Sequence, residues 1–362
     1  MHTYKNDKRT VLTLDAGGTN FVYSAIQAGE EIVESITKPS YGDDLDKCLQ
    51  NIILGFELVI SQLKVKPVAI SFAFPGPADY PNGIIGDLGN LPAFKGGVAL
   101  GPMLEEYFHL PVFINNDGNL FAYGEAIAGI LPEINEELTR VGSKKQYKNL
   151  IGLTLGTGFG AGLVFNNLLL VGDNSLGGEI WLTSNRVNSK VNSEEIVSTR
   201  SILATYAAHS NELTNDLMPV DIYKIAKGEK HGNREAAKIA FEHFGRGLGD
   251  AVANLITLFD GIVVIGGGIT GAQEFYMPAL FAELQNKFEN TNRLVQQVFN
   301  YSDVDSKIEF LKSDAKTISI PYSKKTAEYD SKPRIALAHS KLGASRAIQL
   351  GAYVFALNNL EK

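Results

Sequence analysis

Apolar residues are spaced along this chain in two ways, and each spacing predicts one kind of element. Short apolar runs predict β-strands, and in the first half they cover residues 10–14, 21–27, 68–74 and 112–114. Longer stretches with an apolar residue every three or four positions predict helices, here at 46–64, 102–108 and 119–129. The alternation of strands and helices indicates an α/β fold.

The second half repeats this organisation. Strands are expected at 150–155 and 261–269, and helices at 194–209, 233–258 and 341–357. The polar stretch 131–149 is interpreted as an exposed excursion, and the polar stretch 300–332 as an inserted loop or a small excursion. Each half opens with a strand, a glycine turn and another strand, and 362 residues suffice for two cores. We therefore expect two related α/β lobes with a ligand cleft between them.

Composition excludes several classes of function. The net charge is −7 and no long basic cluster occurs, so nucleic-acid binding has no electrostatic support. No apolar run approaches the roughly 20 residues of a membrane helix. The polar start, MHTYKNDKRT, lacks an apolar signal core, and a single cysteine, Cys48, excludes internal disulfides. A cytoplasmic protein without nucleic-acid or membrane partners is expected.

Two glycine bends are the first candidates for ligand chemistry. The segment LTLGTGFGAGLVF (153–165) matches the sequence pattern G-x-G-x-x-A of dinucleotide-binding turns. However, a predicted strand follows the glycines, whereas a dinucleotide-binding turn leads into a helix. It therefore predicts a hairpin whose backbone approaches a ligand closely. LDAGGTN (14–20) predicts a second such hairpin, and the chain has no P-loop motif. One glycine hairpin per lobe could present backbone amides to a polyphosphate.

The order of these segments resembles that of the ROK group of bacterial sugar kinases, within the actin-like ATPase superfamily. Five blocks carry the resemblance, and they are LDAGGTN (14–20), FPGPAD with GNLP (74–79, 89–92), NNDGNLFAYGEA (115–126), LTLGTGFGAG with GGEI (153–162, 177–180) and VVIGGGIT (263–270). The resemblance implies two ribonuclease-H-like lobes. The first is expected to comprise residues 1–118 plus the C-terminal helix 341–362, and the second residues 119–340.

The resemblance also implies a nucleotide site that binds ATP with Mg²⁺. Asp15 would lie near the metal-bound phosphates, and the phosphate and adenosine contacts would be Gly17, Gly18, Thr19, Thr157, Gly158, Gly267 and Gly268. Alternatives remain for two of these positions. Asp15 could simply cap a turn, and Gly267 with Gly268 could serve only as a tight entry to a helix.

Asp117 is the candidate general base. Phosphoryl transfer needs one carboxylate that accepts the proton of the attacking hydroxyl. Asp117 is expected between a strand and a helix, where a carboxylate is held rigidly and can reach a ligand. The alternative is a plain helix N-cap. The sugar contacts implied by the resemblance are Gly76, Asn90, Asn116, Asp117, Glu179 and Glu194. Glu194 could equally be a carboxylate favoured at a helix start.

The sequence departs from the family after GGEI, where relatives carry a histidine and a cysteine run that bind structural zinc. Here Trp181 and Leu182 follow, and the segment TSNRVNSKVNSEE contains no cysteine or histidine. Zinc prefers nitrogen and sulfur ligands, so a zinc-free member is predicted. Leu182 cannot form hydrogen bonds with a sugar, which is expected to change sugar specificity. Trp181 could stack on a sugar or belong to the core.

The functional expectation is an ATP-dependent kinase that transfers the γ-phosphate to a hexose or N-acetylhexosamine hydroxyl at carbon 6, with a homodimer implied by the resemblance. A non-catalytic or regulatory ROK sugar-binding protein is the alternative. ROK repressors carry a helix-turn-helix domain before the first phosphate hairpin, whereas Asp15 comes almost at once here. A third alternative is an actin-like ATPase that does not act on sugars.

Overall fold

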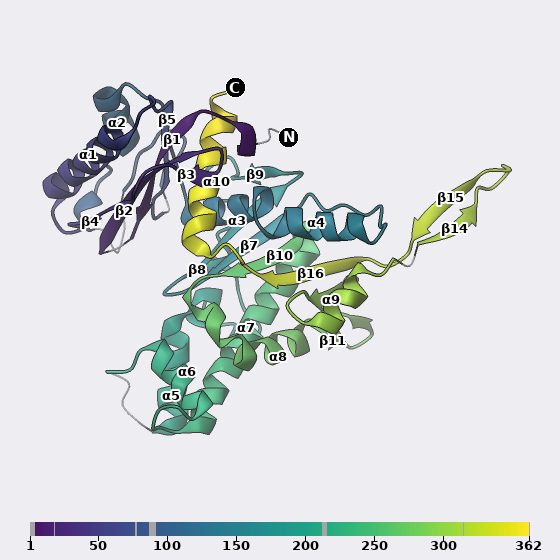
Figure 1. Ribbon diagram of the computed structural model, residues 1–362. Helices are drawn as coiled ribbons and strands as arrows, with labels where there is room; N and C mark the ends of the chain where they lie inside the picture. Colours follow the sequence, from purple (N-terminus) through teal and green to yellow (C-terminus); the bar gives the residue numbers. More distant parts are fainter. Residues whose placement is uncertain are drawn as a thin grey trace. The chain divides into compact units, whose positions relative to one another are not determined.

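The computed structural model describes residues 4–17, 19–76, 78–86, 92–211, 216–313 and 315–361, and its chain is of the mixed α/β class (Figure 1). It divides into two compact units. Unit 1 comprises residues 1–129, 162–178 and 342–362, and unit 2 comprises residues 130–161 and 179–341. Within the described ranges, no helix combines the length and apolar character needed to cross a bilayer.

The sheet of unit 1 has six strands in the order β3-β2-β1-β5-β6, with β4 paired to β2. The strands are β1 (Thr10–Ala16), β2 (Asn20–Gln27), β3 (Glu30–Glu31), β4 (Ile36–Pro39), β5 (Ala69–Ala73) and β6 (Val112–Asn115). β1 and β2 form the expected antiparallel hairpin, whereas β1, β5 and β6 run parallel. The parallel strands bring their carboxyl ends to one edge of the sheet.

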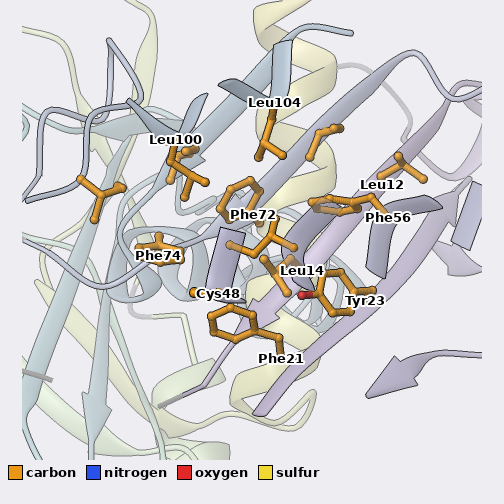
Figure 2. Close-up of a cluster of buried hydrophobic side chains, with 14 of the residues drawn as sticks. Leu12, Leu14, Phe21, Tyr23, Cys48, Phe56, Phe72, Phe74, Leu100 and Leu104 are labelled. Carbon is orange, nitrogen blue, oxygen red and sulfur yellow. The ribbon is translucent and has the colours of Figure 1, made fainter. Parts of the chain in front are cut away.

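Helices cover both faces of this sheet because its strands are apolar on both faces. The helices are α1 (Leu45–Gln62), α2 (Leu100–Phe108), α3 (Asp117–Ile127) and α10 (Ala344–Asn359). Leu12, Leu14 and Phe72 point into a core shared with α1 and α2, which also buries the sole cysteine, Cys48 (Figure 2). On the opposite face, Ala73 packs with residues of α3 and α10.

α3 and α10 cross with their backbones in close contact. A Cβ atom at Gly351 would lie 1.9 Å from the carbonyl oxygen of Leu120, and one at Gly124 would lie 1.9 Å from that of Ala347. Only glycine fits at these two positions. This packing joins the closing helix of the chain to the segment that directly follows β6, and both belong to unit 1.

The second sheet has the order β13-β16-β10-β7-β8-β9. Its strands are β7 (Leu150–Leu155), β8 (Phe159–Phe165), β9 (Leu168–Leu170), β10 (Ile262–Gly266), β13 (Gln297–Asn300) and β16 (Arg334–His339). β7, β10, β16 and β13 run parallel to one another. The glycine segment after β7 leads directly into β8, as the hairpin interpretation predicts.

The helices of unit 2 are α4 (Ile130–Arg140), α5 (Thr199–Ser210), α6 (Pro219–Lys227), α7 (Arg234–Phe259), α8 (Gln273–Leu284) and α9 (Val304–Leu311). Two short ribbons complete the described part of the unit, β11 (Lys287–Phe288) with β12 (Thr291–Asn292), and β14 (Ala315–Ser319) with β15 (Thr326–Asp330). α7 packs against α5, α6 and α8.

Three local predictions are wrong. Residues 131–149 were expected to be an exposed excursion, but α4 occupies most of the segment and buries Leu131, Ile134 and Leu138, which recur at helical spacing. Residues 300–332 were expected to be an inserted loop or a small excursion, and the loop is wrong because the segment contains α9 and the ribbon β14–β15. The helix expected from residue 194 begins at Thr199, and Glu194 lies in a short 3-10 turn before it.

Candidate active site

Three neighbouring parallel strands end in one row at the carboxyl edge of the unit 1 sheet. Asp15 on β1 is in register with Ala73 on β5, and Ala73 is in register with Asn115 on β6. Asp117 follows as the first residue of α3. The carboxyl edge is where parallel α/β sheets bind ligands. Asp15 and Asp117 therefore belong to the same edge of one sheet.

Three asparagines fix the start of α3. Oδ1 of Asn115 accepts hydrogen bonds from the backbone N–H of Asn116 at 2.8 Å and from Nδ2 of Asn119 at 3.0 Å. Oδ1 of Asn116, the N-cap, accepts from the N–H of Gly118 at 2.8 Å, and Oδ1 of Asp117 accepts from the same N–H at 2.8 Å. The N-cap is thus Asn116. One carboxylate oxygen of Asp117, Oδ1, is held by the N–H of Gly118.

The pKa of the Asp117 carboxyl is raised. The main cause is the removal of water by surrounding protein atoms, and the negative charge of Asp15 raises the pKa further, while hydrogen bonds from backbone N–H groups oppose both. Asp117 is an exposed residue, so solvent reaches this carboxylate at the sheet edge. A carboxylate with a raised pKa accepts a proton more readily.

The first glycine bend joins β1 to β2. The N–H of Gly17 donates to the carbonyl oxygen of Asn20 at 3.1 Å, and a Cβ at Gly17 would lie 2.9 Å from that oxygen. Thr19 is exposed in this bend, and its carbonyl accepts from the N–H of Ser40 at 2.9 Å. Gly18 lies outside the described residues. The bend therefore requires glycine at position 17 for a steric reason.

Two further predicted sugar contacts follow β5. A Cβ at Gly76 would lie 2.3 Å from the hydroxyl oxygen of Tyr80, which itself donates to the carbonyl oxygen of Phe74 at 2.9 Å. Glycine at position 76 thus leaves room for Tyr80 to hold the end of the strand. Asn90 lies outside the described residues.

The second glycine bend, Gly156-Thr157-Gly158, belongs to unit 2. The N–H of Gly156 donates to the carbonyl oxygen of Gly158 at 3.1 Å. Among the described residues, no acceptor is paired with the N–H groups of Thr157 and Gly158. A Cβ at Gly156 would meet nothing within 4 Å. Two neighbouring backbone amides in such a bend can bind an anion.

Glu194 and Arg200 hold this second bend in place. Oε2 of Glu194 accepts from the N–H of Phe159 at 3.0 Å, and Oε1 accepts from Nη2 of Arg200 at 3.0 Å. Nη1 of Arg200 donates to the carbonyl oxygen of Thr157 at 3.2 Å, and Nη2 also donates to Glu195 at 3.0 Å. Sequence reasoning missed Arg200, because no motif marks a residue that acts by contacting backbone.

The predicted adenosine turn follows β10. Gly267 has φ +99°, and a Cβ there would lie 2.3 Å from the carbonyl oxygen of Leu155 on β7. Gly268 has open space around its Cα. A short 3-10 turn beginning at Gly268 then leads into α8. Gly267 is therefore required by the sheet itself, and Gly268 leaves room for a ligand.

The segment after GGEI is organised by side-chain hydrogen bonds. Nε1 of Trp181 donates to Oε2 of Glu179, and Leu182 is 59% exposed. Trp181 is half-buried, so the indole lies at the surface of unit 2 beside a candidate sugar contact. Both of its predicted alternatives, stacking and core packing, stay predictions.

The segment 183–193, which lacks zinc ligands, is fastened to α7. Nδ2 of Asn185 donates to the carbonyl oxygen of Gly247 at 3.0 Å, and the N–H of Arg186 donates to Oδ2 of Asp250 at 3.0 Å. Asp250 is 2% exposed and forms an ion pair with the buried Arg293. Hydrogen bonds and a buried ion pair therefore shape this segment.

In the ranges that the structure describes, no three His, Cys, Asp or Glu side chains are grouped as ligands. Mg²⁺ in kinases is held by one or two carboxylates together with substrate phosphates, and it prefers oxygen ligands. The half-buried carboxylate of Asp15 at the sheet edge fits that donor set.

Comparison with known proteins decides the family. The model of the ROK family matches residues 11–305. The chain belongs to the ROK family. This ROK protein is 51% identical to a glucokinase from Parabacteroides distasonis whose crystal structure it matches with a TM-score of 0.91, over 99% of both chains. The ROK proteins of this kind have the actin-like ATPase fold, which confirms the predicted fold class.

Two other relatives differ in function. The ROK protein is 28% identical to an N-acetyl-D-glucosamine kinase of Photobacterium profundum over 281 residues, which are 72% of this chain and 85% of the relative. It is 24% identical to a xylose repressor of Caldicellulosiruptor bescii over 325 residues, which are 84% of this chain and 75% of the relative. The family thus contains both sugar kinases and a repressor.

Proposed function

We propose that this ROK protein is an ATP-dependent hexose kinase that phosphorylates the hydroxyl at carbon 6 of glucose or a related sugar. The observation that carries the proposal is the setting of Asp117. Its carboxylate lies at the carboxyl edge of a parallel sheet, one oxygen is held by the N–H of Gly118, and its pKa is raised. The second oxygen is left to accept a proton from a sugar hydroxyl.

The phosphate end of the proposal rests on the two glycine bends. The amides of Thr157 and Gly158 would hold phosphate oxygens. In unit 1 the bend that contains Gly17 and Thr19 would approach the phosphates, with the N–H of Gly17 donating to Asn20 within the bend. Mg²⁺, when bound near Asp15, would neutralise charge on the phosphates. Gly268 would leave room for adenosine. We assign Glu194 to positioning the second bend, because both of its oxygens are already engaged there.

The sugar end of the proposal keeps the remaining polar contacts. Glu179 would accept hydrogen bonds from sugar hydroxyls together with Asn90 and Asn116, since each hydroxyl removed from water needs a partner. Leu182, 59% exposed, supplies no hydrogen bond next to Glu179. The 51% identity to a glucokinase supports glucose as the first sugar to test.

The decisive experiment measures ADP release with Mg-ATP against glucose, N-acetylglucosamine, mannose, N-acetylmannosamine, fructose and allose. Sugar-dependent ADP release, absent with 6-deoxyglucose, is the expected result. ATP hydrolysis that ignores every sugar would favour an ATPase. Sugar binding by calorimetry without any turnover would favour a regulatory protein, the alternative that the similarity to a xylose repressor brings.

A further inference from the structure

A two-stranded ribbon stands out from unit 2 between α9 and β16 (Figure 1). β14 and β15 pair antiparallel, with Ile318 opposite Ala327 and Lys316 opposite Tyr329, and the pairing continues from the N–H of Ile320 to the carbonyl of Lys325 at 3.1 Å. We call residues 315–330 the arm. A two-stranded ribbon alone is marginally stable in water, so its order needs further support.

The two faces of the arm differ in character. Side chains alternate along each strand, and residues directly opposite share a face. One face carries Lys316, Ile318, Ile320, Lys325, Ala327 and Tyr329, whereas the other carries Ala315, Thr317, Ser319, Thr326, Glu328 and Asp330. Ile318, Ile320 and Tyr329 are 41%, 39% and 48% exposed. The first face is apolar and positively charged, and both carboxylates of the arm lie on the second.

Ion pairs hold the end of the arm that joins the rest of unit 2. Arg334 is buried and pairs with Asp330 at 3.1 Å, while Lys332 pairs with Glu309 of α9 at 2.9 Å. Lys144 pairs with Glu328 at 2.9 Å. These contacts involve the polar face and the base, so the apolar face stays open. A preorganised element loses less entropy when it docks.

A groove of complementary character lies beside α8. It has a volume of about 520 Å³, its apolar wall is formed by Met277, Pro278 and Phe281, and its charged lining residues are Glu274 and Asp303. The lining contains no basic residue. An apolar surface flanked by carboxylates is the counterpart of an apolar surface flanked by lysines.

We propose that the arm of one copy docks in the α8 groove of a second copy. Ile318 and Ile320 would cover Met277, Pro278 and Phe281, while Lys316 and Lys325 would face Glu274 and Asp303. Each chain carries both the arm and the groove, so one twofold axis makes both contacts at once, which favours a second copy over an unrelated partner. The inference does not depend on catalytic activity.

The test follows the oligomeric state of the full chain by sedimentation velocity over a concentration series. The wild type is expected to dimerise, and Ile318→Asp with Ile320→Asp to weaken the dimer at least about tenfold. The matched control, Thr317→Asp with Ser319→Asp, changes the opposite face of the same strand and is expected to dimerise normally. Far-UV circular dichroism and melting curves confirm that each variant is folded.

Charge exchange identifies the docking site. Glu274→Lys alone and Lys325→Glu alone are each expected to weaken the dimer, and the two together to restore part of it. A zero-length carbodiimide cross-link is expected between Lys316 or Lys325 and Glu274 or Asp303. A wild type that stays monomeric would overturn the proposal. So would a dimer that the isoleucine variants leave intact, or cross-links that join the arm to another surface.

Discussion

Nη2 of Arg200 lies 3.0 Å from Oε1 of Glu194, and the same guanidinium donates to the carbonyl oxygen of Thr157. The second glycine bend is thus held from the side of α5. We predict that Arg200→Ala raises the KM for ATP about tenfold or more and lowers kcat less, because misplaced amides weaken phosphate binding. Initial-rate kinetics with ATP varied at saturating sugar measure this.

The matched control for Arg200 is Arg246→Ala, which removes another exposed arginine from an ion pair with Glu242 within α7. Its kinetic constants are expected to match the wild type. Equal ATP affinity in the wild type and the Arg200 variant would show that the bend keeps its shape without the guanidinium.

Asp117→Asn is predicted to lower kcat by about 10²–10⁴-fold, the usual contribution of a general base, with ATP binding retained. Asp43→Asn, at an exposed carboxylate in unit 1, serves as control and is expected to be fully active. ADP release measures kcat, and nucleotide titration by calorimetry measures ATP binding. Full activity of the Asp117→Asn variant would remove this carboxylate from the chemistry.

The raised pKa of Asp117 also predicts an effect on stability. Because the pKa in the folded state exceeds that in the unfolded state, the favourable contribution exists at pH values below the unfolded pKa and is lost as pH rises through the folded pKa. Asp117→Asn should therefore raise the free energy of unfolding at neutral pH and change it little in acid. Urea unfolding at the two pH values checks this.

The raised pKa of Asp117 also predicts that kcat/KM falls at acidic pH. Activity requires the ionised form of Asp117, so the rate is expected to rise with pH through the raised pKa rather than at the ordinary aspartate value. A carbon-13 carboxyl titration followed by NMR identifies the group. A titration at or below the ordinary value would contradict the raised pKa of Asp117.

Gly267→Ala is predicted to destabilise the protein by about 1–3 kcal/mol, since the added Cβ meets the carbonyl of Leu155 and φ is positive. Gly268→Ala is the control at the neighbouring position, where a Cβ finds open space, and it should leave the free energy of unfolding nearly unchanged. Chemical denaturation of both variants gives the comparison.

The stability of segment 183–193 should not depend on a metal that a chelator can remove. Incubation with EDTA is expected to leave the melting temperature unchanged, whereas Arg293→Met should lower the free energy of unfolding by about 3–5 kcal/mol by leaving the buried carboxylate of Asp250 without its partner. A melting temperature that falls with EDTA and recovers with zinc would contradict the zinc-free prediction.

The sequence predicts the elements that end at the candidate site well. β1, β5, β6 and α3 were expected within a few residues of their observed bounds, because apolar strands and helical spacing are strong local signals, but the N-cap is Asn116 and not Asp117. The helix α4 was missed because its glutamates obscure the apolar stripe of the helix. Pro132 does not argue against this helix, because proline is tolerated in the first turn.

Other features depend on tertiary contacts that no local pattern encodes. Glu194 was expected to contact sugar or to begin a helix, but its neighbours in space are Phe159 and Arg200. The apolar face of the arm can be recognised only when the strand register is known, because that register places Ile318 opposite Ala327. Register and long-range ion pairs are set by the fold as a whole, so sequence reasoning could not supply them.

Cys48 belongs to α1 and is fully buried, and burial raises the pKa of its thiol to about 11. Thiolate, the reactive form, is therefore scarce at neutral pH, and maleimide reagents should leave the native protein unmodified. Any cysteine introduced at the surface, for example in place of Tyr322 at the tip of the arm, would be the only thiol to react. The fold thus offers a background for site-specific fluorescent labels without removal of its own cysteine.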